Sequence, residues 1–168
     1  HSTSSAASDV YKRQDEDSLG GAEQHASRSG VACMIADDEQ DAFDITAEIL
    51  SFLPDHTLAE PLVTRGSDPW DRHCVGLEEL VPTDPNRPYD MREVIKEVVD
   101  EGRFVELSEY YAENVVIGFA RLDGHSIGIV GNQPSVLAGC LDIDASVKAA
   151  RFISCLLYTS PSPRDGIG

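Results

Sequence analysis

Basic side chains are scarce in this chain: 13 Lys and Arg residues stand against 30 Asp and Glu residues, and the formal net charge is −17. A surface of this sign repels phosphate backbones and anionic membranes. We therefore expect no nucleic-acid partner. The charge does not exclude small phosphorylated ligands, because backbone N–H groups at a helix start attract phosphate whatever the net charge of the protein.

Long apolar runs and paired cysteines are also missing. No run approaches the roughly 18 to 20 residues that span a bilayer, and the N-terminal region lacks the apolar core of a signal peptide. We therefore expect a soluble, intracellular protein without direct membrane insertion. The four cysteines form no C-x-x-C pair and have no histidine cluster near them, which argues against a zinc site, and no metal site is predicted. Cys33 falls in an apolar run and is predicted to be a small buried residue.

The two ends of the chain differ from its middle. Residues 1–14 are rich in Ser and Ala without an apolar period, and residues 154–168 break off a helical pattern with Pro and Ser. Both ends resemble translated sequencing-adapter sequence, so we predict that they are non-native and set them aside. Their composition also allows a disordered N-terminal arm and a Pro/Ser-rich tail.

The middle of the chain is predicted to hold parts of two domains. Residues 54–88 are charged, dotted with proline and poor in apolar runs, which is typical of a linker. Residues 15–53 precede this linker and residues 89–153 follow it, and both carry periodic apolar patterns. Two partial domains therefore fit the pattern better than one compact domain.

The first part, residues 15–53, predicts a short buried strand over residues 29–36 and then a helix that ends at Pro54. The acidic residues 37–41 supply the N-cap and first-turn carboxylates of this helix. They could be imagined as a metal site, but a helix start explains them without one. The predicted apolar stripe of the helix consists of Phe43, Ile45, Ala47, Ile49, Leu50 and Leu53.

The second part begins with a capped helix and continues as a β-hairpin. Asp90 and Glu93 form an Asp-x-x-Glu capping box, and Gly102 is predicted to end the helix. Residues 104–107 can form a short strand. Two alternating runs follow, joined by Asp123 and Gly124, which are typical residues of a two-residue hairpin turn.

A last helix is predicted after the hairpin, with Asp142 or Asp144 as its N-cap. Its apolar residues indicate a face packed against the sheet. Lys148 and Arg151 lie on this helix, and we interpret them as solvated residues or as partners in salt links between subunits.

Two segments of the second part carry a family resemblance. Residues 114–134 read NVVIGFARLDGHSIGIVGNQP, and residues 138–153 read AGCLDIDASVKAARFI. Together they resemble the carboxyltransferase subunits of biotin-dependent acyl-CoA carboxylases, most closely the propionyl-CoA carboxylase beta chains. The resemblance implies an α/β, crotonase-like (ClpP/crotonase) fold, with residues 15–53 from the end of the N-terminal domain and residues 89–153 from the start of the C-terminal domain.

The resemblance also implies a reaction, the transfer of a carboxyl group from carboxybiotin to the α carbon of a short acyl-CoA such as propionyl-CoA. In this family, backbone N–H pairs hold the oxyanions of the thioester and of the biotin ureido group. The Gly-Gly-Ala segments that usually supply these pairs lie outside residues 15–153, so no catalytic residue is assigned and the isolated chain is expected to be inactive.

The partners implied by the resemblance are a biotin carboxylase or biotin carboxyl carrier subunit and an acyl-CoA substrate. Biotin on the carrier and the coenzyme A thioester are the implied cofactors of an ATP-dependent ligase holoenzyme of fatty acid metabolism. The full-length subunit is expected to be a homo-hexamer, in the cytoplasm or, in a eukaryote, in the mitochondrial matrix.

Four residues of the loop after the hairpin are predicted to lie near bound biotin or CoA: Asn132, Gln133, Gly139 and Asp142. Their types also allow structural roles, with Asn132 and Gln133 shaping a turn, Gly139 adopting a positive φ and Asp142 capping a helix. Further candidates for ligand proximity are Gly20, Gly21 and His25, in a segment similar to one late in the family's first domain. A tight turn is the favoured role there.

Two other functions stay open. The carboxyltransferase subunit of a biotin-dependent acyl-CoA decarboxylase, of the methylmalonyl-CoA type, shares these motifs and runs the transfer in reverse. A noncatalytic binding or assembly module is the alternative from a different class.

Overall fold

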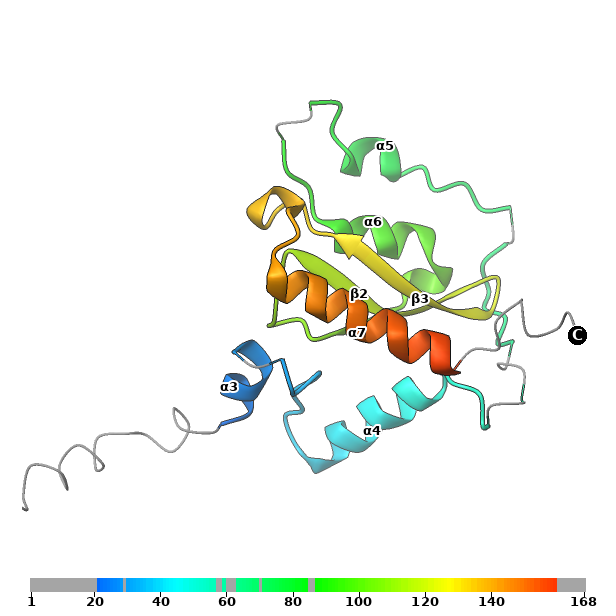
Figure 1. Cartoon of the computed structure of the whole chain (residues 1–168). Coiled ribbons are helices and arrows are strands. Elements are labelled where there is room, and N and C mark those ends of the chain that lie inside the picture. The colour runs from blue at the N-terminus through cyan, green and yellow to red at the C-terminus, as the bar shows by residue number, and fades with distance from the viewer. Residues whose placement is uncertain are drawn as a thin grey trace, which may run out of the picture.

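The computed structural model describes residues 21–28, 30–56, 59, 63–69, 71–84 and 87–159. Its centre is a three-stranded antiparallel sheet, with α6 on one face and α7 and α4 on the other (Figure 1). In chain order the elements are α3 (Ala22–Ser27), α4 (Glu39–Leu50), α5 (Leu77–Leu80), α6 (Met91–Val98), the 3₁₀ turn η1 (Asp100–Gly102), β1 (Phe104–Leu107), β2 (Val115–Leu122), β3 (His125–Asn132), the 3₁₀ turn η2 (Leu137–Gly139) and α7 (Ile143–Thr159).

The sheet confirms the predicted hairpin. Its strand order is β1-β2-β3, and Val115 pairs with Asn132 while Leu122 pairs with His125. Both turn residues, Asp123 (φ 49°) and Gly124 (φ 79°), are left-handed. A two-residue turn of this kind matches the right-handed twist of the flanking strands.

One face of the sheet packs against α6. Ile95 and Val99 lie on Val116 and Ala120 of β2 in a closed apolar cluster. Gly118 stands between the two β2 residues, and a Cβ atom there would come within 2.2 Å of the Val105 carbonyl oxygen. Only glycine permits this backbone approach.

The other face packs against α7 and the end of the α4 segment. Phe119 stacks on Phe52 at 5.7 Å between ring centroids and meets Phe152 edge-on at 5.3 Å. Such aromatic pairs add about 0.5–1.5 kcal/mol each beyond the apolar area they bury. Phe52 comes from residues 15–53 and Phe152 from residues 89–153, so the two segments share one core.

The strand predicted over residues 29–36 is wrong for residues 30–36, which form no strand; Ser29 lies outside the described residues. The backbone of this run meets the sheet at the Cys33 carbonyl, which accepts a hydrogen bond from Ser108 N at 2.7 Å just past the end of β1. An apolar run becomes a strand only when another strand pairs along it. Cys33 is exposed, so its predicted burial is wrong too.

The helix predicted to end before Pro54 is confirmed as α4, and the Asp38 side chain caps it by accepting a hydrogen bond from Asp41 N at 2.8 Å. Its predicted apolar stripe is divided. Ile49 packs on the core, but Phe43 is 62% exposed and Leu50 is 60% exposed. The predicted apolar stripe is therefore wider than the part of α4 that packs on the core.

The start of α6 was predicted correctly at Asp90, whose side chain accepts a hydrogen bond from Arg92 N at 2.8 Å. The reciprocal half of the capping box is wrong, because Glu93 pairs with Lys96 at 2.9 Å instead. The helix ends at Val98, and Gly102 (φ +64°) closes the following turn η1 rather than α6 itself.

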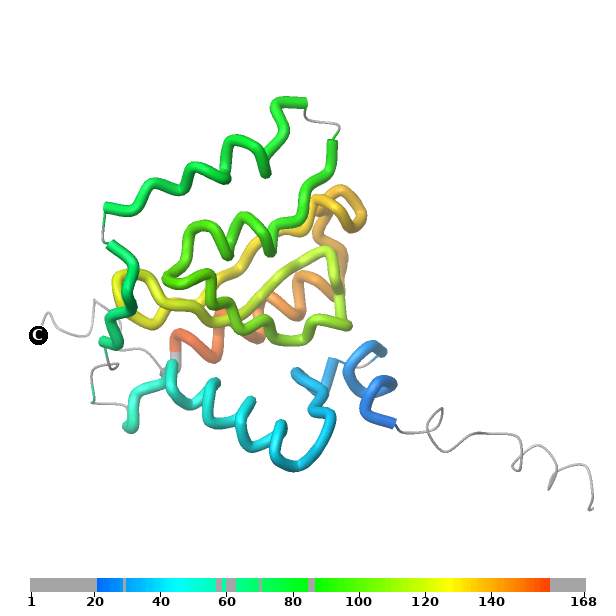
Figure 2. Tube along the Cα trace, turned by 180° about the vertical axis from the view of Figure 1, so that it is seen from behind, coloured from blue at the N-terminus to red at the C-terminus, as the bar shows by residue number. Residues whose placement is uncertain are grey.

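The described parts of residues 54–88 pass the hairpin tip and α6, as the view from behind shows (Figure 2). Apart from α5, the described part of this range is irregular. Among the described residues, no helix has the length and apolar composition needed to cross a membrane.

Candidate functional site

Residues 132–141, here called the 132–141 loop, connect the end of β3 to α7. Three consecutive residues of this loop are left-handed: Leu137 (φ 47°), Ala138 (φ 53°) and Gly139 (φ 69°). For a non-glycine residue this conformation costs about 1–2 kcal/mol. Leu137 is 66% exposed. Strained, exposed backbone of this kind gathers at functional sites, so the loop is the candidate ligand surface.

Asn132 and Gly139, two of the predicted site residues, lie together at the base of the loop. Asn132 Nδ2 donates to the Gly139 carbonyl oxygen at 3.0 Å. Gly139 is buried, and a Cβ atom on it would lie 3.3 Å from Asn132 Cβ, tighter than ordinary contact. The pair closes the loop across seven residues of sequence.

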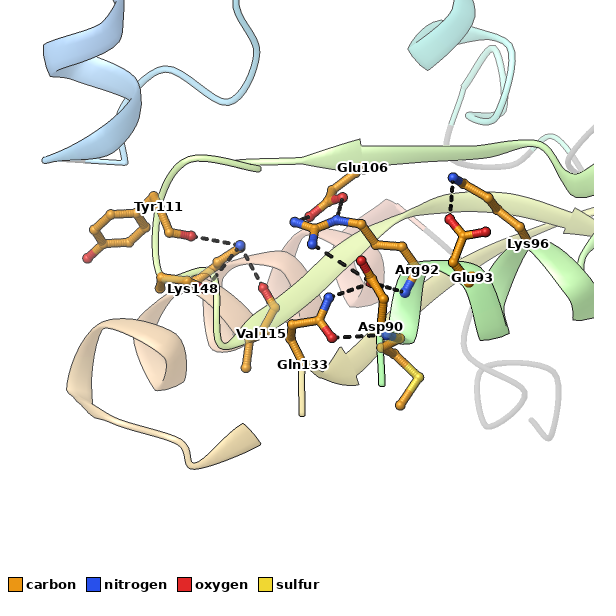
Figure 3. Close-up of polar contacts among 11 residues, drawn as sticks. Asp90, Arg92, Glu93, Lys96, Glu106, Tyr111, Val115, Gln133 and Lys148 are labelled. Carbon is orange, nitrogen blue, oxygen red and sulfur yellow. Dashed lines mark hydrogen bonds and ion pairs between the residues drawn. The ribbon is translucent and has the colours of Figure 1, made fainter. Parts of the chain in front are cut away.

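The Gln133 side chain is buried and points toward the start of α6 (Figure 3). Its side chain is 0% exposed. Its Nε2 donates to Asp90 Oδ1 at 2.7 Å, and its Oε1 accepts from Met91 N at 2.9 Å. A side chain from the end of β3 therefore completes the cap of α6, 42 residues earlier in the chain.

Asp142 caps α7 through a hydrogen bond from Ala145 N to Asp142 Oδ1 at 2.8 Å, which confirms one of the two predicted caps. This backbone hydrogen bond, followed by the Asn114 side chain, holds the pKa of the Asp142 carboxyl below its ordinary value. Hydrogen bonds to the ionised form are the physical cause. Asp142 is therefore ionised at neutral pH and lies at the exposed edge of the loop.

The second group of predicted site residues lies elsewhere. Gly20 is outside the described residues, Gly21 is the N-cap of α3, and His25 lies on α3. The Gly21 carbonyl accepts hydrogen bonds from Gln24 N at 3.0 Å and His25 N at 3.3 Å. Both views place α3 apart from the 132–141 loop, so the structure does not bring Gly21 and His25 to it (Figures 1 and 2).

Lys148 is the residue that the sequence interpretation misjudged. Instead of being solvated or in a salt link, it is 3% exposed. Its ammonium donates to the carbonyl oxygens of Tyr111 (2.7 Å), Ala112 (3.3 Å) and Val115 (2.7 Å), as Figure 3 shows in part. Burial lowers its pKa from 10.5 to about 8. Its position in the sequence could have indicated burial, because Lys148 follows Ala145 by three residues and both lie on the buried face of α7.

Asn114 is a second residue that the sequence did not reveal. It is 2% exposed and ends the connection between β1 and β2, residues 108–114, here called the 108–114 loop. Its Nδ2 donates to the Cys140 carbonyl at 2.7 Å, and its own carbonyl accepts from Gln133 N at 2.9 Å. One residue thus holds both ends of the 132–141 loop.

An ion pair near the Lys148 ammonium connects α6 to β1. Arg92 forms a two-pronged pair with Glu106, at 2.5 Å from Nε and 2.9 Å from the terminal nitrogen (Figure 3). The Glu106 carboxylate raises the pKa of Arg92 still further. A bidentate, partly buried pair is stronger than an exposed one and fixes both side chains.

A hollow of about 460 Å³ opens beside the loop. Its walls come from the end of the 54–88 segment and from the loop itself, and they include an aromatic ring, prolines and a guanidinium. The lining residues are Pro82, Asp84, Arg87, Pro88, Tyr89, Pro134, Ser135 and Ala138. In the part of the chain that the structure describes, no group of three or more His, Cys, Asp or Glu side chains is placed to hold a metal ion.

Comparison with known proteins gives the family. Residues 6–158 match the carboxyl transferase domain. The chain is 50% identical over 140 residues to the propionyl-CoA carboxylase carboxyltransferase subunit of Haloferax mediterranei. This alignment covers 82% of this chain and 27% of that protein. The chain is also 48% identical over 136 residues to the methylmalonyl-CoA decarboxylase subunit alpha of Veillonella parvula, covering 80% of this chain and 26% of that protein.

Among solved structures, transcarboxylase 12S with methylmalonyl-coenzyme A and methylmalonic acid bound superposes with a TM-score of 0.83 at 40% identity, over 90% of this chain and 29% of that one. This likeness confirms the predicted α/β, crotonase-like fold. The chain spans about a quarter of the length of the curated relatives cited above. With a family match over most of its length, it belongs to the carboxyl transferase domain family.

Proposed function

We propose that this chain is part of a carboxyltransferase that moves a carboxyl group from carboxybiotin to the α carbon of propionyl-CoA or a similar short acyl-CoA. The observation that carries the proposal is the 50% identity over 82% of the chain to the propionyl-CoA carboxylase subunit of Haloferax mediterranei. The superposition on transcarboxylase 12S supports it independently, because that structure holds methylmalonyl-coenzyme A.

Within this function, we assign the 132–141 loop to the surface near bound biotin or CoA. The proposed site residues are Asn132, Gln133 and Gly139 of the loop and Asp142, which follows it and caps α7; Gln133 acts through the shape of the backbone because its side chain is buried. The exposed left-handed turn and the hollow beside it support this assignment. Gly21 and His25 are weaker candidates, since α3 lies apart from the loop.

The hollow fits a bicyclic ureido group in its chemistry. Tyr89 and the prolines give apolar walls, while Arg87 and Ser135 give polar groups at the same opening. Ligand sites combine apolar walls with a few such polar groups. Carboxybiotin supplies the carboxyl group when bound, and the role of these residues is to bind and orient it.

The remaining parts of the assignment follow from the proposed function. A biotin carboxyl carrier or biotin carboxylase subunit presents the biotin, in an ATP-dependent holoenzyme, and the full-length subunit forms a hexamer, as transcarboxylase 12S does. Residues 15–53 and 89–153 belong to two successive domains joined by residues 54–88. The enzyme is assigned to the cytoplasm or, in a eukaryote, to the mitochondrial matrix.

A segment replacement tests the proposal. Residues 22–153 of this chain replace the aligned residues of the full-length Haloferax mediterranei subunit, and the hybrid is assayed with its biotin partner for ATP-dependent incorporation of labelled bicarbonate into propionyl-CoA. We expect at least a tenth of the parent activity, whereas the isolated 168-residue chain should show none. A hybrid that also carries Gly139→Val is the matched comparison, and its carboxylation activity should be lower. A folded hybrid without activity would contradict the proposal.

The second candidate is the reverse reaction, and the 48% identity to the Veillonella parvula methylmalonyl-CoA decarboxylase subunit favours it. The full-length protein should be assayed for loss of the carboxyl group from methylmalonyl-CoA to free biotin. Decarboxylation without net carboxylation in the holoenzyme would select this candidate. A folded full-length protein that is inactive in both directions would favour a noncatalytic assembly module.

A further inference from the structure

Lys148 has no acidic partner at hydrogen-bonding distance among the described residues, although it is 3% exposed. All three of its N–H groups go instead to the backbone carbonyls of Tyr111, Ala112 and Val115. An ammonium has three donors and no acceptor, so its hydrogen-bonding capacity is filled. A buried charge in this arrangement organises the backbone around it.

The backbone that Lys148 holds is strained. Ser108 (φ 54°) and Ala112 (φ 45°) are left-handed non-glycine residues of the 108–114 loop. The carbonyls of Tyr111 and Ala112 converge on one ammonium, whose charge offsets the repulsion between their dipoles. Without it, the Tyr111 carbonyl would lose this donor at a cost of about 1–3 kcal/mol, whereas the Ala112 carbonyl would keep its hydrogen bond from Val115 N at 3.1 Å.

The same loop supports the candidate ligand surface. Asn114 follows directly, and it binds Gln133 N through its carbonyl (2.9 Å) and the Cys140 carbonyl through its Nδ2 (2.7 Å). Contacts therefore run from Lys148 to the 108–114 loop, and from Asn114 to both ends of the 132–141 loop. Neither Lys148 nor Asn114 reaches the exposed turn at Leu137 and Ala138.

We propose that Lys148 and Asn114 are positioning residues: they fix the 108–114 loop as a platform on which the 132–141 loop closes in its ligand-binding shape. This inference rests on the proposed function, because it assigns a substrate or biotin to that loop. It adds two buried residues that touch no ligand and yet determine affinity. Preorganised support of this kind decides how accurately a site is held.

The charged groups around the ammonium define its pH response. Glu106 on β1 and Glu109 and Glu113 in the 108–114 loop favour the protonated form, whereas burial and Arg92 on α6 disfavour it. A neutral amine donates two hydrogen bonds instead of three. One carbonyl of the platform therefore loses its donor as the pH rises through about 8.

The test compares Lys148→Met and Asn114→Ala with wild type in the full-length protein and its biotin partner. We expect the KM for either acyl-CoA or the biotin carrier to rise at least about tenfold in each variant, while kcat changes less than about threefold. Lys96→Met, at an exposed lysine on α6, is the matched control and should leave both KM values unchanged. In wild type the affected KM should rise between pH 7 and 9, and in Lys148→Met it should not.

Hydrogen exchange separates failure of this inference from failure of the proposed function. If wild type shows no carboxyl transfer, faster exchange at the amides of residues 133–140 in both variants still supports the positioning role. In the double variant the combined effect of the two substitutions should be less than the sum of their separate effects, because both residues act through one platform. Unchanged exchange in the loop together with unchanged KM values would overturn the inference; if Lys148→Met fails to fold, Asn114→Ala alone decides.

Discussion

The two ends of the β2–β3 hairpin are held by different kinds of group. At the tip, the Asp100 carboxylate accepts hydrogen bonds from Asp123 N at 3.0 Å and Gly124 N at 2.7 Å. Asp123 is exposed, so its amide can exchange this partner for water. The bond at Asp123 is therefore one that solvent can replace, whereas Gly124 is buried.

At the open end the anchors are buried side chains. Asn114, Gln133 and Lys148 are 2%, 0% and 3% exposed. A polar group that loses its partner in such a place also lacks water, so the loss is much larger than at the surface. The comparison shows that buried side chains hold the end bearing the candidate ligand loop, whereas the tip is held in part by an exposed bond at Asp123.

The largest loss of stability is expected at Gln133. Gln133→Met keeps the volume but leaves Met91 N and the Asp90 carboxylate without this partner, which should lower the free energy of unfolding by about 3 kcal/mol in urea denaturation of the chain. Gln40→Met, at an exposed glutamine of α4, should change it by less than about 0.5 kcal/mol. Equal effects of the two substitutions would remove the contrast between buried and exposed anchors.

The pH dependence of Lys148 sharpens the same contrast. Its folded pKa is about 8, below the ordinary 10.5. Between these values the unfolded chain holds the proton and the folded chain does not, so the Lys148 contribution to the free energy of unfolding rises with pH.

Urea denaturation at pH 7.5, 9 and 10 measures this contribution as the difference between wild type and Lys148→Met. Because other titrating groups cancel in the difference, it should grow with pH, and Lys96→Met should show no such trend. A pH-independent difference for Lys148→Met would contradict the buried position of the ammonium.

A smaller pair of effects with opposite signs is expected within the 132–141 loop. Gly139→Ala places a Cβ atom at φ +69° and 3.3 Å from Asn132 Cβ, which should destabilise the chain by about 1–2 kcal/mol. Ala138→Gly relieves a left-handed alanine and should stabilise it by about 0.5 kcal/mol after the added freedom of the unfolded chain. Thermal unfolding should therefore shift in opposite directions.

The smallest loss of stability is expected at the tip. Asp100→Ala removes two hydrogen bonds from backbone N–H groups, but water reaches the exposed Asp123, so the loss should be about 1 kcal/mol. Asp71→Ala, at an exposed position, serves as its control. A loss at Asp100 as large as that at Gln133 would reverse the ranking of the two ends.

The parts predicted from the sequence are those whose partners lie nearby in the chain. The hairpin follows from alternation and the Asp123–Gly124 turn, and the helix caps at Asp90 and Asp142 follow from residue type. The bond from Gln133 to Met91 spans 42 residues, and the bond from Lys148 to Tyr111 spans 37. No local pattern encodes such distant contacts, so a buried lysine was interpreted as a solvated one.

The most direct test of the contrast is amide hydrogen exchange in the wild-type chain, expressed as protection factors. We predict that Gln133 N, bonded to the buried Asn114, is at least about tenfold better protected than the exposed Asp123 N at the tip. Equal protection at the two ends, or better protection at the tip, would contradict the claim that buried side chains hold the candidate ligand loop.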